Sequence, residues 1–335
     1  MHIELDSIES FRQQARSGGL GHTVVQGLDL RQESTAVLAG PCTDAVFLGC
    51  KFEDAAARHI LETGGLIFPR LPDLPYRCYR PTLYTVDELM EGYVPGDPAS
   101  QKDCRDQRIY AHFDHRRKQP GPIPVIETLA QRLHDHAIDD ALADLLHGEG
   151  EGGERHVVAI MGGHSMQRTD ADYRKVAQIA HRLAGHDPRI LMASGGGPGA
   201  MEACTLGAWL ARRDETALDE ALRILARAPS YKDPEWLDTA LEVRAAFPDP
   251  VDSLGIPTWF YGHEPPNLFA THIAKYFSNS LREDGLLAIA KHGVIYAPGS
   301  AGTIQEVFQD AAQNHYGTFQ LVSPMVFLDR HYWQE

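Results

Sequence analysis

The stretch Gly293-Val294-Ile295-Tyr296-Ala297-Pro298-Gly299-Ser300-Ala301-Gly302-Thr303-Ile304-Gln305-Glu306 decides the fold. Its first five residues are mostly apolar and predict a buried strand, and the Pro-Gly pair that follows predicts a turn. Apolar residues at helical spacing then predict a helix over residues 304–314. Small residues in such a turn let backbone N–H groups approach a ligand, and the start of the helix carries partial positive charge. The stretch is therefore suited to holding an anion such as a phosphate.

A second glycine-rich turn follows the apolar run 190–193 and reads Ser194-Gly195-Gly196-Gly197-Pro198-Gly199, with a predicted helix over residues 200–212 behind it. A third candidate follows the apolar run 156–161 and reads Gly162-Gly163-His164-Ser165. Turns that each leave an apolar strand indicate neighbouring strands whose carboxyl ends open on one crevice.

Strands and helices alternate after residue 156. The predicted strands span residues 156–161, 190–193, 257–261, 294–297 and 324–328. The predicted helices span residues 170–183, 200–212, 217–228, 234–246, 268–281 with a second piece to 290, and 304–314. This alternation predicts an α/β protein with a parallel sheet covered by helices on both faces, and the glycine loops at its carboxyl edge.

The chain is predicted to divide at a Gly/Glu-rich stretch, residues 148–155, which has nothing to bury and indicates an exposed linker. Residues 1–147 then form a smaller N-terminal mixed α/β domain of unclear role, and residues 156–335 form a second domain that contains the three glycine-rich turns. In the N-terminal part, residues 45–48 and 65–69 predict strands and residues 126–146 predict a helix.

Composition limits the partners. The chain has 335 residues and a formal charge of −15, which disfavours a nucleic-acid or anionic-membrane surface because such surfaces need clustered Lys and Arg. The five cysteines and the histidines show no metal-ligand spacing, so we expect no metal and reduced thiols in a cytoplasmic protein. No signal peptide is indicated, and no apolar run is long enough to span a membrane.

The pair of loops GGGPGAMEA and PGSAGTIQE resembles the Lonely Guy (LOG) family, whose hallmarks are a GGGxxGLM-type loop and a PGGxGTxxE loop. That family consists of Rossmann-like nucleotide hydrolases, which release a base from a nucleoside 5'-monophosphate and leave ribose 5-phosphate. The segment Glu264-Pro265-Pro266-Asn267 is closer to the bacterial nucleotide 5'-monophosphate nucleosidases than to the short cytokinin-activating members. The resemblance covers about residues 155–330. It implies that residues 156–335 form a Rossmann-like nucleotide-binding catalytic domain.

The resemblance implies the roles of individual residues. Glu306 matches the acid that ends the PGGxGTxxE loop, and Arg282 occupies the place of the catalytic arginine. The phosphate and ribose would be held by the two loops: Gly195, Gly196, Gly197, Gly199, Gly299, Ser300, Ala301, Gly302 and Thr303. His164, Ser165 and Asn267 are further candidates for substrate contact. The chain departs from the family pattern at Ser300, Gln305 and Ala200-Met201, none of which removes the acid or the arginine.

Cleavage of an N-glycosidic bond leaves positive charge on the ribose, and a nearby carboxylate stabilises that charge and activates water. We expect Glu306 to do this work, and Arg282 to anchor the nucleotide or orient Glu306. No metal and no redox cofactor is required. The resemblance also implies a homodimer or a higher homo-oligomer.

Other interpretations remain open. Thr303 and Glu306 fit a capping box, Asn267 could cap a helix that begins near residue 268, and Glu202 could be an ordinary first-turn acid. The substrate could be a cytokinin riboside 5'-monophosphate, or the protein could be a nucleotide-binding or sensing module without turnover. A dinucleotide oxidoreductase is disfavoured because the first loop lacks G-x-G-x-x-G. A lysine decarboxylase is disfavoured because neither glycine loop places a lysine for pyridoxal phosphate.

Overall fold

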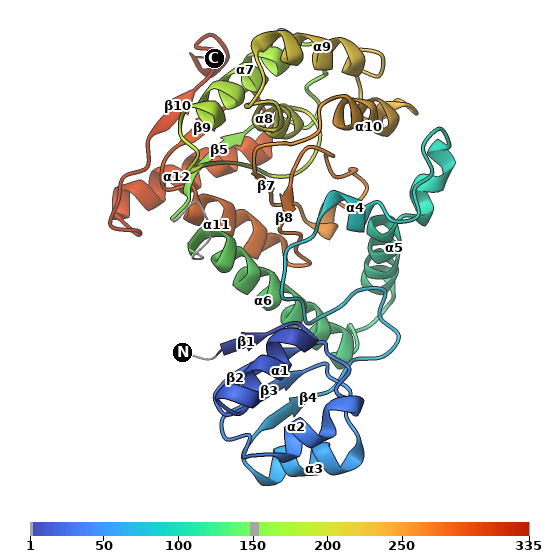
Figure 1. Cartoon of the computed structure of the whole chain (residues 1–335). Helices are drawn as coiled ribbons and strands as arrows, with labels where there is room; N and C mark the ends of the chain where they lie inside the picture. Colours follow the sequence, from blue (N-terminus) through green and yellow to red (C-terminus); the bar gives the residue numbers. More distant parts are fainter. Residues whose placement is uncertain (1–2, 148–153, 335) are drawn as a thin grey trace. The chain divides into compact units, whose positions relative to one another are not determined.

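The structure is a computed structural model that describes residues 3–147 and 154–334. The chain forms two compact units, one made of Met1–Thr82 and Pro122–Ala141 and the other of Leu83–Gly121 and Leu142–Glu335 (Figure 1). Each unit contains its own parallel sheet. Most of the predicted linker, residues 148–153, lies outside the described residues.

The larger unit contains a six-stranded parallel sheet in the order β10-β9-β5-β6-β7-β8. The strands are β5 (His156–Met161), β6 (Ile190–Ser194), β7 (Ser253–Gly255), β8 (His272–Ile273), β9 (Val294–Tyr296) and β10 (Met325–Phe327). The chain runs outward from β5 in one direction as far as β8 and returns to the other side of β5 with β9. The predicted Rossmann-like parallel sheet is confirmed. Ligands of such sheets bind where the strand order reverses, which here is between β5 and β9.

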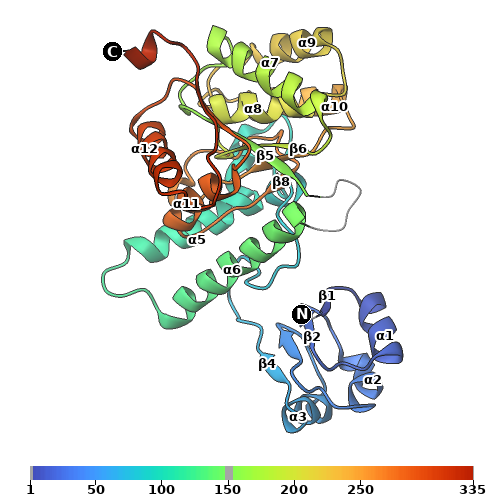
Figure 2. The same ribbon diagram turned by 90° about the vertical axis from the view of Figure 1, so that its left-hand side faces the viewer.

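Helices cover both faces of this sheet. Figure 2 shows α7 (Ala171–His186) and α8 (Ala200–Trp209) on one side of β5 and β6, and α11 (Asn279–Ile289) and α12 (Ala301–Tyr316) on the other. Two more helices, α9 (Glu215–Leu225) and α10 (Trp236–Ala246), lie between β6 and β7 in the chain. Short 3₁₀ helices occur at Trp259–Tyr261 and Tyr332–Gln334.

Two predicted elements of this unit are wrong. Residues 257–261 are not a strand: β7 ends before Pro257, and Trp259–Tyr261 form a 3₁₀ turn. Residues 268–281 are not one helix, because β8 lies inside the range and α11 begins only at Asn279. Apart from Thr271 and His272, every residue from 268 to 277 is buried, so the segment has no exposed face, and periodicity alone does not separate a buried strand from a buried helix.

The unit boundaries also differ from the predicted domains. The larger unit includes α4 (Val86–Leu89), the 3₁₀ helix Pro98–Asp103 and α5 (Arg105–Lys118), which were predicted to belong to the N-terminal domain. The physical reason is a buried polar contact: Asp106 of α5 accepts hydrogen bonds from Nζ of Lys275 at 2.6 Å and from Nε1 of Trp259 at 3.1 Å. The long helix α6 (Val125–His147) contains residues of both units.

The smaller unit has four parallel strands in chain order, β1 (Ile3–Leu5), β2 (Thr23–Gln26), β3 (Val46–Leu48) and β4 (Leu66–Phe68). The connections contain α1 (Ile8–Ser17), the 3₁₀ helix Arg31–Glu33 with α2 (Ser34–Leu38), and α3 (Asp54–Glu62). Right-handed crossovers in a sheet of this order place every helix on the same face. Phe11, Val25, Phe47 and Ile60 form part of the core between the helices and the sheet. The predicted strands near 45–48 and 65–69 are confirmed, and β1 and β2 were not predicted.

No helix in the described ranges 3–147 and 154–334 has the length and apolar character needed to cross a bilayer.

Candidate functional site

A cavity of about 390 Å³ opens in the larger unit, where the loops after β5, β6 and β9 meet. The three glycine loops that the sequence singled out therefore converge. The lining residues include Gly162, Gly163, His164, Gly195, Met201, Tyr261, Glu264, Arg282, Glu283, Ser300, Ala301, Gly302, Thr303 and Glu306. Its volume lies in the range of pockets that hold small-molecule ligands. A smaller cavity of about 50 Å³ shares Gly195, Met201, Tyr261, Glu264 and Arg282 with it.

Glu306 and Arg282 face each other in this cavity. Oε1 of Glu306, on α12, lies 3.5 Å from Nη1 of Arg282, on α11, and each side chain is only 13% exposed. Nε of Arg282 donates a hydrogen bond of 2.9 Å to the carbonyl oxygen of Ile256, which fixes the guanidinium. Burial raises the pKa of Glu306; Arg282 opposes that shift, and the nearby charge of Glu283 adds to it. The carboxyl is thus partly desolvated, as acid–base groups in active sites often are.

The start of α12 is open to the cavity. The helix begins at Ala301, its N-cap is Ser300, and no side chain among the described residues caps it. Thr303 is therefore the third helical residue and Glu306 the sixth, so the capping-box interpretation of these two residues is wrong. The first N–H groups of a helix have no partner within it, and Ala301, Gly302 and Thr303 all line the cavity. Together they can bind an anion.

The loop after β6 packs directly against the arginine. A Cβ atom at position 195 would overlap Nη2 of Arg282 and would lie 2.7 Å from Sδ of Met201, so only glycine leaves room for the guanidinium. Gly196 and Gly199 have φ angles of +74° and +73°, in the region that favours glycine. The second loop therefore has its glycines for close packing and for backbone geometry.

For the nucleotide hydrolase that the sequence predicts, we expect Gly195→Ala to lower kcat/KM about 100-fold, because the added methyl group displaces Arg282 from Ile256 and from Glu306, and small misplacements of catalytic groups have effects of this size. Steady-state kinetics with a nucleotide substrate measures the effect. The matched control is Gly285→Ala in the same helix as Arg282, where a Cβ meets nothing within 4 Å. That variant should keep its activity and gain about 0.5–1 kcal/mol of stability from the better helix former. Equal kinetics for the two variants would contradict the contact between Gly195 and Arg282.

Asn267 lies behind the second glycine loop and does not line either cavity. Its side chain is fully buried: Nδ2 donates to the carbonyl oxygen of Gly197 at 3.2 Å, and Oδ1 accepts from Oγ1 of Thr205 at 2.8 Å. Oδ1 also accepts from two backbone N–H groups, those of Phe269 and Ala270. The structure thus places Asn267 as a tie that holds the loop, and no helix begins at residue 268 for it to cap.

The other predicted residues separate into two groups. His164 lines the larger cavity, with Nδ1 at 3.5 Å from Oε1 of Glu264, whereas Ser165 lines neither cavity. Gly199 and Gly299 also line neither cavity, and each is required instead by the conformation or the packing of its loop. A Cβ at position 299 would overlap Oγ1 of Thr303, so that glycine allows the turn to close against α12.

A buried ion pair between Arg168 and Glu202 holds the first turn of α8, which directly follows the second glycine loop. Glu202, in the first turn of α8, is fully buried and accepts from Nε and Nη2 of Arg168 at 3.0 and 2.5 Å. Tyr173 donates to the same carboxylate at 2.8 Å. Arg168 also donates to Oγ1 of Thr239 in α10 at 2.8 Å. Glu202 is therefore not an ordinary surface acid near a helix start. It joins α8 to α7 and α10, and nothing in its local sequence indicates this because its partners are distant along the chain.

Lys275 was not among the predicted site residues, although it lines the smaller cavity. It is 1% exposed, pairs with Asp106, and its Nζ lies 5.2 Å from the ring centre of Trp259. Glu264 entered the prediction only as part of the segment that resembles the nucleosidases, yet it lines both cavities. Both residues stand in segments whose secondary structure was predicted wrongly or not at all, so their neighbours could not be foreseen.

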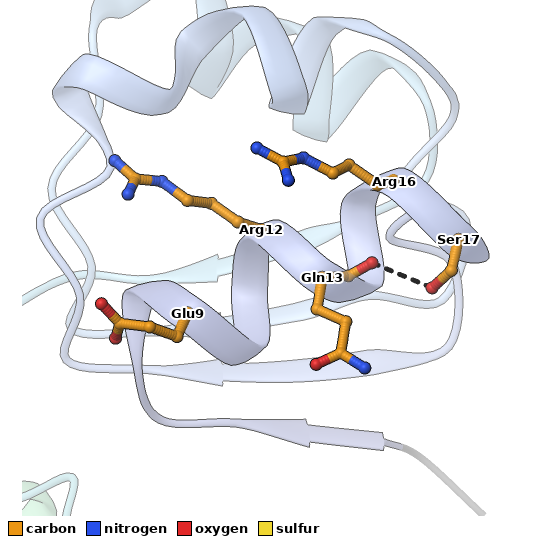
Figure 3. A pocket seen from close by; sticks show the side chains of 5 residues that line it. All are labelled: Glu9, Arg12, Gln13, Arg16 and Ser17. Atoms are coloured by element: carbon orange, nitrogen blue, oxygen red, sulfur yellow. Dashed lines mark hydrogen bonds between the residues drawn. The ribbon is translucent and has the colours of Figure 1, made fainter.

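A separate hollow of about 520 Å³ lies on α1 in the smaller unit, and Figure 3 shows the side chains that line it. They are Glu9, Arg12, Gln13, Arg16 and Ser17, all exposed and all from one helix. Arg12 already pairs with Glu33 at 2.6 Å. The hollow has no buried polar group and no facing element among its lining residues, so it lacks the features of the cavity in the larger unit.

Within residues 3–147 and 154–334, no group of three or more His, Cys, Asp or Glu side chains is placed to hold a metal ion. The chain matches no protein-family model and no curated protein sequence.

Proposed function

We propose that the protein hydrolyses the N-glycosidic bond of nucleoside 5'-monophosphates and releases the free base and ribose 5-phosphate. The observation that carries the proposal is the placement of Glu306: a largely buried carboxylate beside Arg282, in a cavity that also contains the open start of a helix. The resemblance of the two glycine loops to the Lonely Guy family supports the same reaction.

The phosphate of the substrate would bind to the first N–H groups of α12, with the hydroxyl of Thr303 nearby. This contact is remote from the bond that breaks, and its binding energy would hold the ribose in place against the acid. Because Glu306 is one turn beyond these N–H groups, a 5'-phosphate there brings the sugar to the carboxylate.

Glu306 would act on the sugar. As the base departs, positive charge develops on the ribose, and an ionised carboxylate next to it lowers the barrier and can take a proton from the attacking water. Arg282 would keep Glu306 in position and bind the nucleotide through charge-assisted hydrogen bonds. A site for binding alone does not benefit from a carboxylate beside the phosphate, which favours the enzyme over a sensing module.

The test is incubation of the purified protein with a panel of purine, pyrimidine and isopentenyl-adenine monophosphates, with the released base measured by chromatography. Release of base from ordinary nucleotides supports the proposal. Release from isopentenyl-adenine monophosphate alone would make it a cytokinin-activating enzyme instead. Saturable binding without release would identify a nucleotide-binding module.

The raised pKa of Glu306 predicts the pH dependence of this reaction. The carboxyl must be ionised to stabilise the sugar, and its ionised fraction falls as the pH falls through its pKa. Since burial raises that pKa above the ordinary 4.5, the acidic limb of the profile of kcat/KM should be centred above pH 4.5. Replacing the neighbouring Glu283 with Gln removes a charge that raises the pKa, so the limb should move to lower pH. An unmoved limb would show that another group controls it.

The resemblance also supports a cytoplasmic homodimer or higher homo-oligomer. Two exposed apolar side chains agree with an interface near the site, since Phe308 of α12 is 73% exposed and Leu281 of α11 is 38% exposed. Light scattering on the purified protein measures the oligomeric state directly.

A further inference from the structure

Glu264 is held rigidly at the edge of the cavity. Three residues further on, the backbone N–H of Asn267 donates to the carbonyl oxygen of Gly196 at 3.1 Å, and its side chain bonds to Gly197. The two residues between are Pro265 and Pro266, both buried, and proline restricts the backbone. On the other side, the N–H of Glu264 donates to the carbonyl oxygen of Tyr261 at 3.0 Å. The segment therefore holds the backbone of Glu264 in a fixed place at the edge of the cavity.

The carboxylate lines both cavities, and its side chain is only 18% exposed. Its recorded ion-pair partner within the described part of the chain is His164, whose Nδ1 lies 3.5 Å from Oε1 and whose side chain is 44% exposed. Neither Arg282 nor Lys275, the two cations near the cavities, pairs with it: Arg282 contacts Glu306 and Lys275 contacts Asp106. Oε2 is turned toward the glycine loop, 3.4 Å from the position of a Cβ at Gly197.

The second glycine loop sets the distance between the two acidic positions. Arg282, with Glu306 behind it, packs at Gly195, and Glu264 packs at Gly197, two residues further along. Two residues of extended chain span at most about 7 Å. Because Glu306 and Glu264 also line the same cavity of about 390 Å³, a nucleotide whose sugar lies at Glu306 has its base within reach of Glu264, across the loop.

An ionised carboxylate only accepts hydrogen bonds, and it accepts two in parallel from a planar pair of donors. Guanine presents such a pair, N1–H and the 2-amino group. Hypoxanthine keeps N1–H but lacks the amino group. Adenine and cytosine place a ring acceptor next to their amino group, and that acceptor would face the carboxylate. Uracil places its one N–H between two carbonyl groups.

We infer that Glu264 is the residue that selects the base, and that the preferred substrate is a guanine nucleotide bound through N1–H and the 2-amino group. This inference rests on the proposed function for the reaction, but the choice of base is a separate property of the same cavity. It assigns to Glu264 a contact with the substrate at the end remote from the phosphate.

The deciding comparison is between GMP and IMP, which differ in the 2-amino group alone. The parent protein should cleave GMP with a kcat/KM at least about tenfold above that for IMP, mainly through a lower KM. In Glu264→Gln the side chain offers one acceptor and one donor, which match the N1–H and the 6-oxo group that guanine and hypoxanthine share. The GMP:IMP ratio should therefore fall to about one. An unchanged ratio in Glu264→Gln, or no preference in the parent, would overturn the inference.

A matched control separates base recognition from loss of charge. Glu283→Gln removes the same charge from the lining of the same cavity, and it should leave the GMP:IMP ratio of the parent unchanged even if both rates change. A fall in the ratio for both variants would show a general electrostatic effect and would contradict a direct contact with Glu264.

Binding measured without turnover distinguishes this inference from the proposed reaction. Calorimetry with GMP and IMP on Glu306→Gln, with and without Glu264→Gln, reports base selection alone. If GMP binds in preference to IMP, if that preference disappears with Glu264→Gln, and if the parent protein cleaves no nucleotide, the inference is sustained and the hydrolase proposal ends. If the parent protein cleaves many nucleotides and no variant shows a binding preference for GMP, the hydrolase proposal is sustained and the inference about Glu264 ends.

Discussion

Glu306→Gln should lower kcat for base release by at least about 1,000-fold, while the dissociation constant for the nucleotide changes little. The amide has the size of the carboxyl group and keeps a hydrogen-bond acceptor near Arg282, but it carries no charge to stabilise the developing charge on the sugar, and it cannot take a proton from water. Chromatography of released base gives kcat, and calorimetry gives the dissociation constant.

The control is Asp284→Asn, the same chemical change on the exposed side of α11. Asp284 accepts a hydrogen bond from Gln309 of α12 and does not line the cavity. Its variant should release base at the rate of the parent. If Glu306→Gln were as active as this control, the carboxylate would have no part in the reaction, and the proposed mechanism would have to be abandoned.

Arg168→Met should lower the free energy of unfolding by about 3–5 kcal/mol, because it leaves the carboxylate of Glu202 buried without its cation. Chemical denaturation followed by circular dichroism measures this change. Since Glu202 anchors the first turn of α8, just after the second glycine loop, base release should also fall in the fraction that remains folded.

The double variant Arg168→Met with Glu202→Gln should be more stable than Arg168→Met alone. The uncharged amide needs no cation, and its oxygen still accepts the hydrogen bond from Tyr173. If Arg168→Met unfolded at the denaturant concentration of the parent, the pair would not be buried as described.

The sequence predicted the parallel sheet of the larger unit well, because β5, β6 and β9 are short apolar runs bounded by glycine turns. It failed between residues 257 and 281. Within that range, residues 268–277 are almost all buried, so no exposed face gives the pattern a period. The order of the strands in the sheet could not be predicted in detail, since no local sequence pattern indicates that β9 pairs with β5. Of the small sheet, β3 and β4 were predicted and β1 and β2 were not.

The candidate site could be predicted as far as local motifs extend. Glu306, Arg282 and the residues from Ser300 to Thr303 were chosen from loops and from resemblance, and the structure brings them to one cavity. Partners that are distant along the chain could not be foreseen: Arg168 lies 34 residues from Glu202, and Asp106 lies 169 residues from Lys275. Asn267 was predicted to be a candidate for substrate contact, but its side chain is fully buried and bonds to Gly197, Thr205, Phe269 and Ala270 within the protein.

The interleaved make-up of the two units restricts how the protein can be dissected. The chain passes from one unit to the other at residues 82–83, 121–122 and 141–142, so no single cut frees either of them. A fragment that starts at residue 156 keeps every glycine loop but loses Asp106, and Lys275 is then left as an isolated ammonium group in an apolar surrounding with Trp259. Such a fragment should aggregate on expression, whereas deletion of residues 1–69 keeps α5 and its aspartate in the remaining chain.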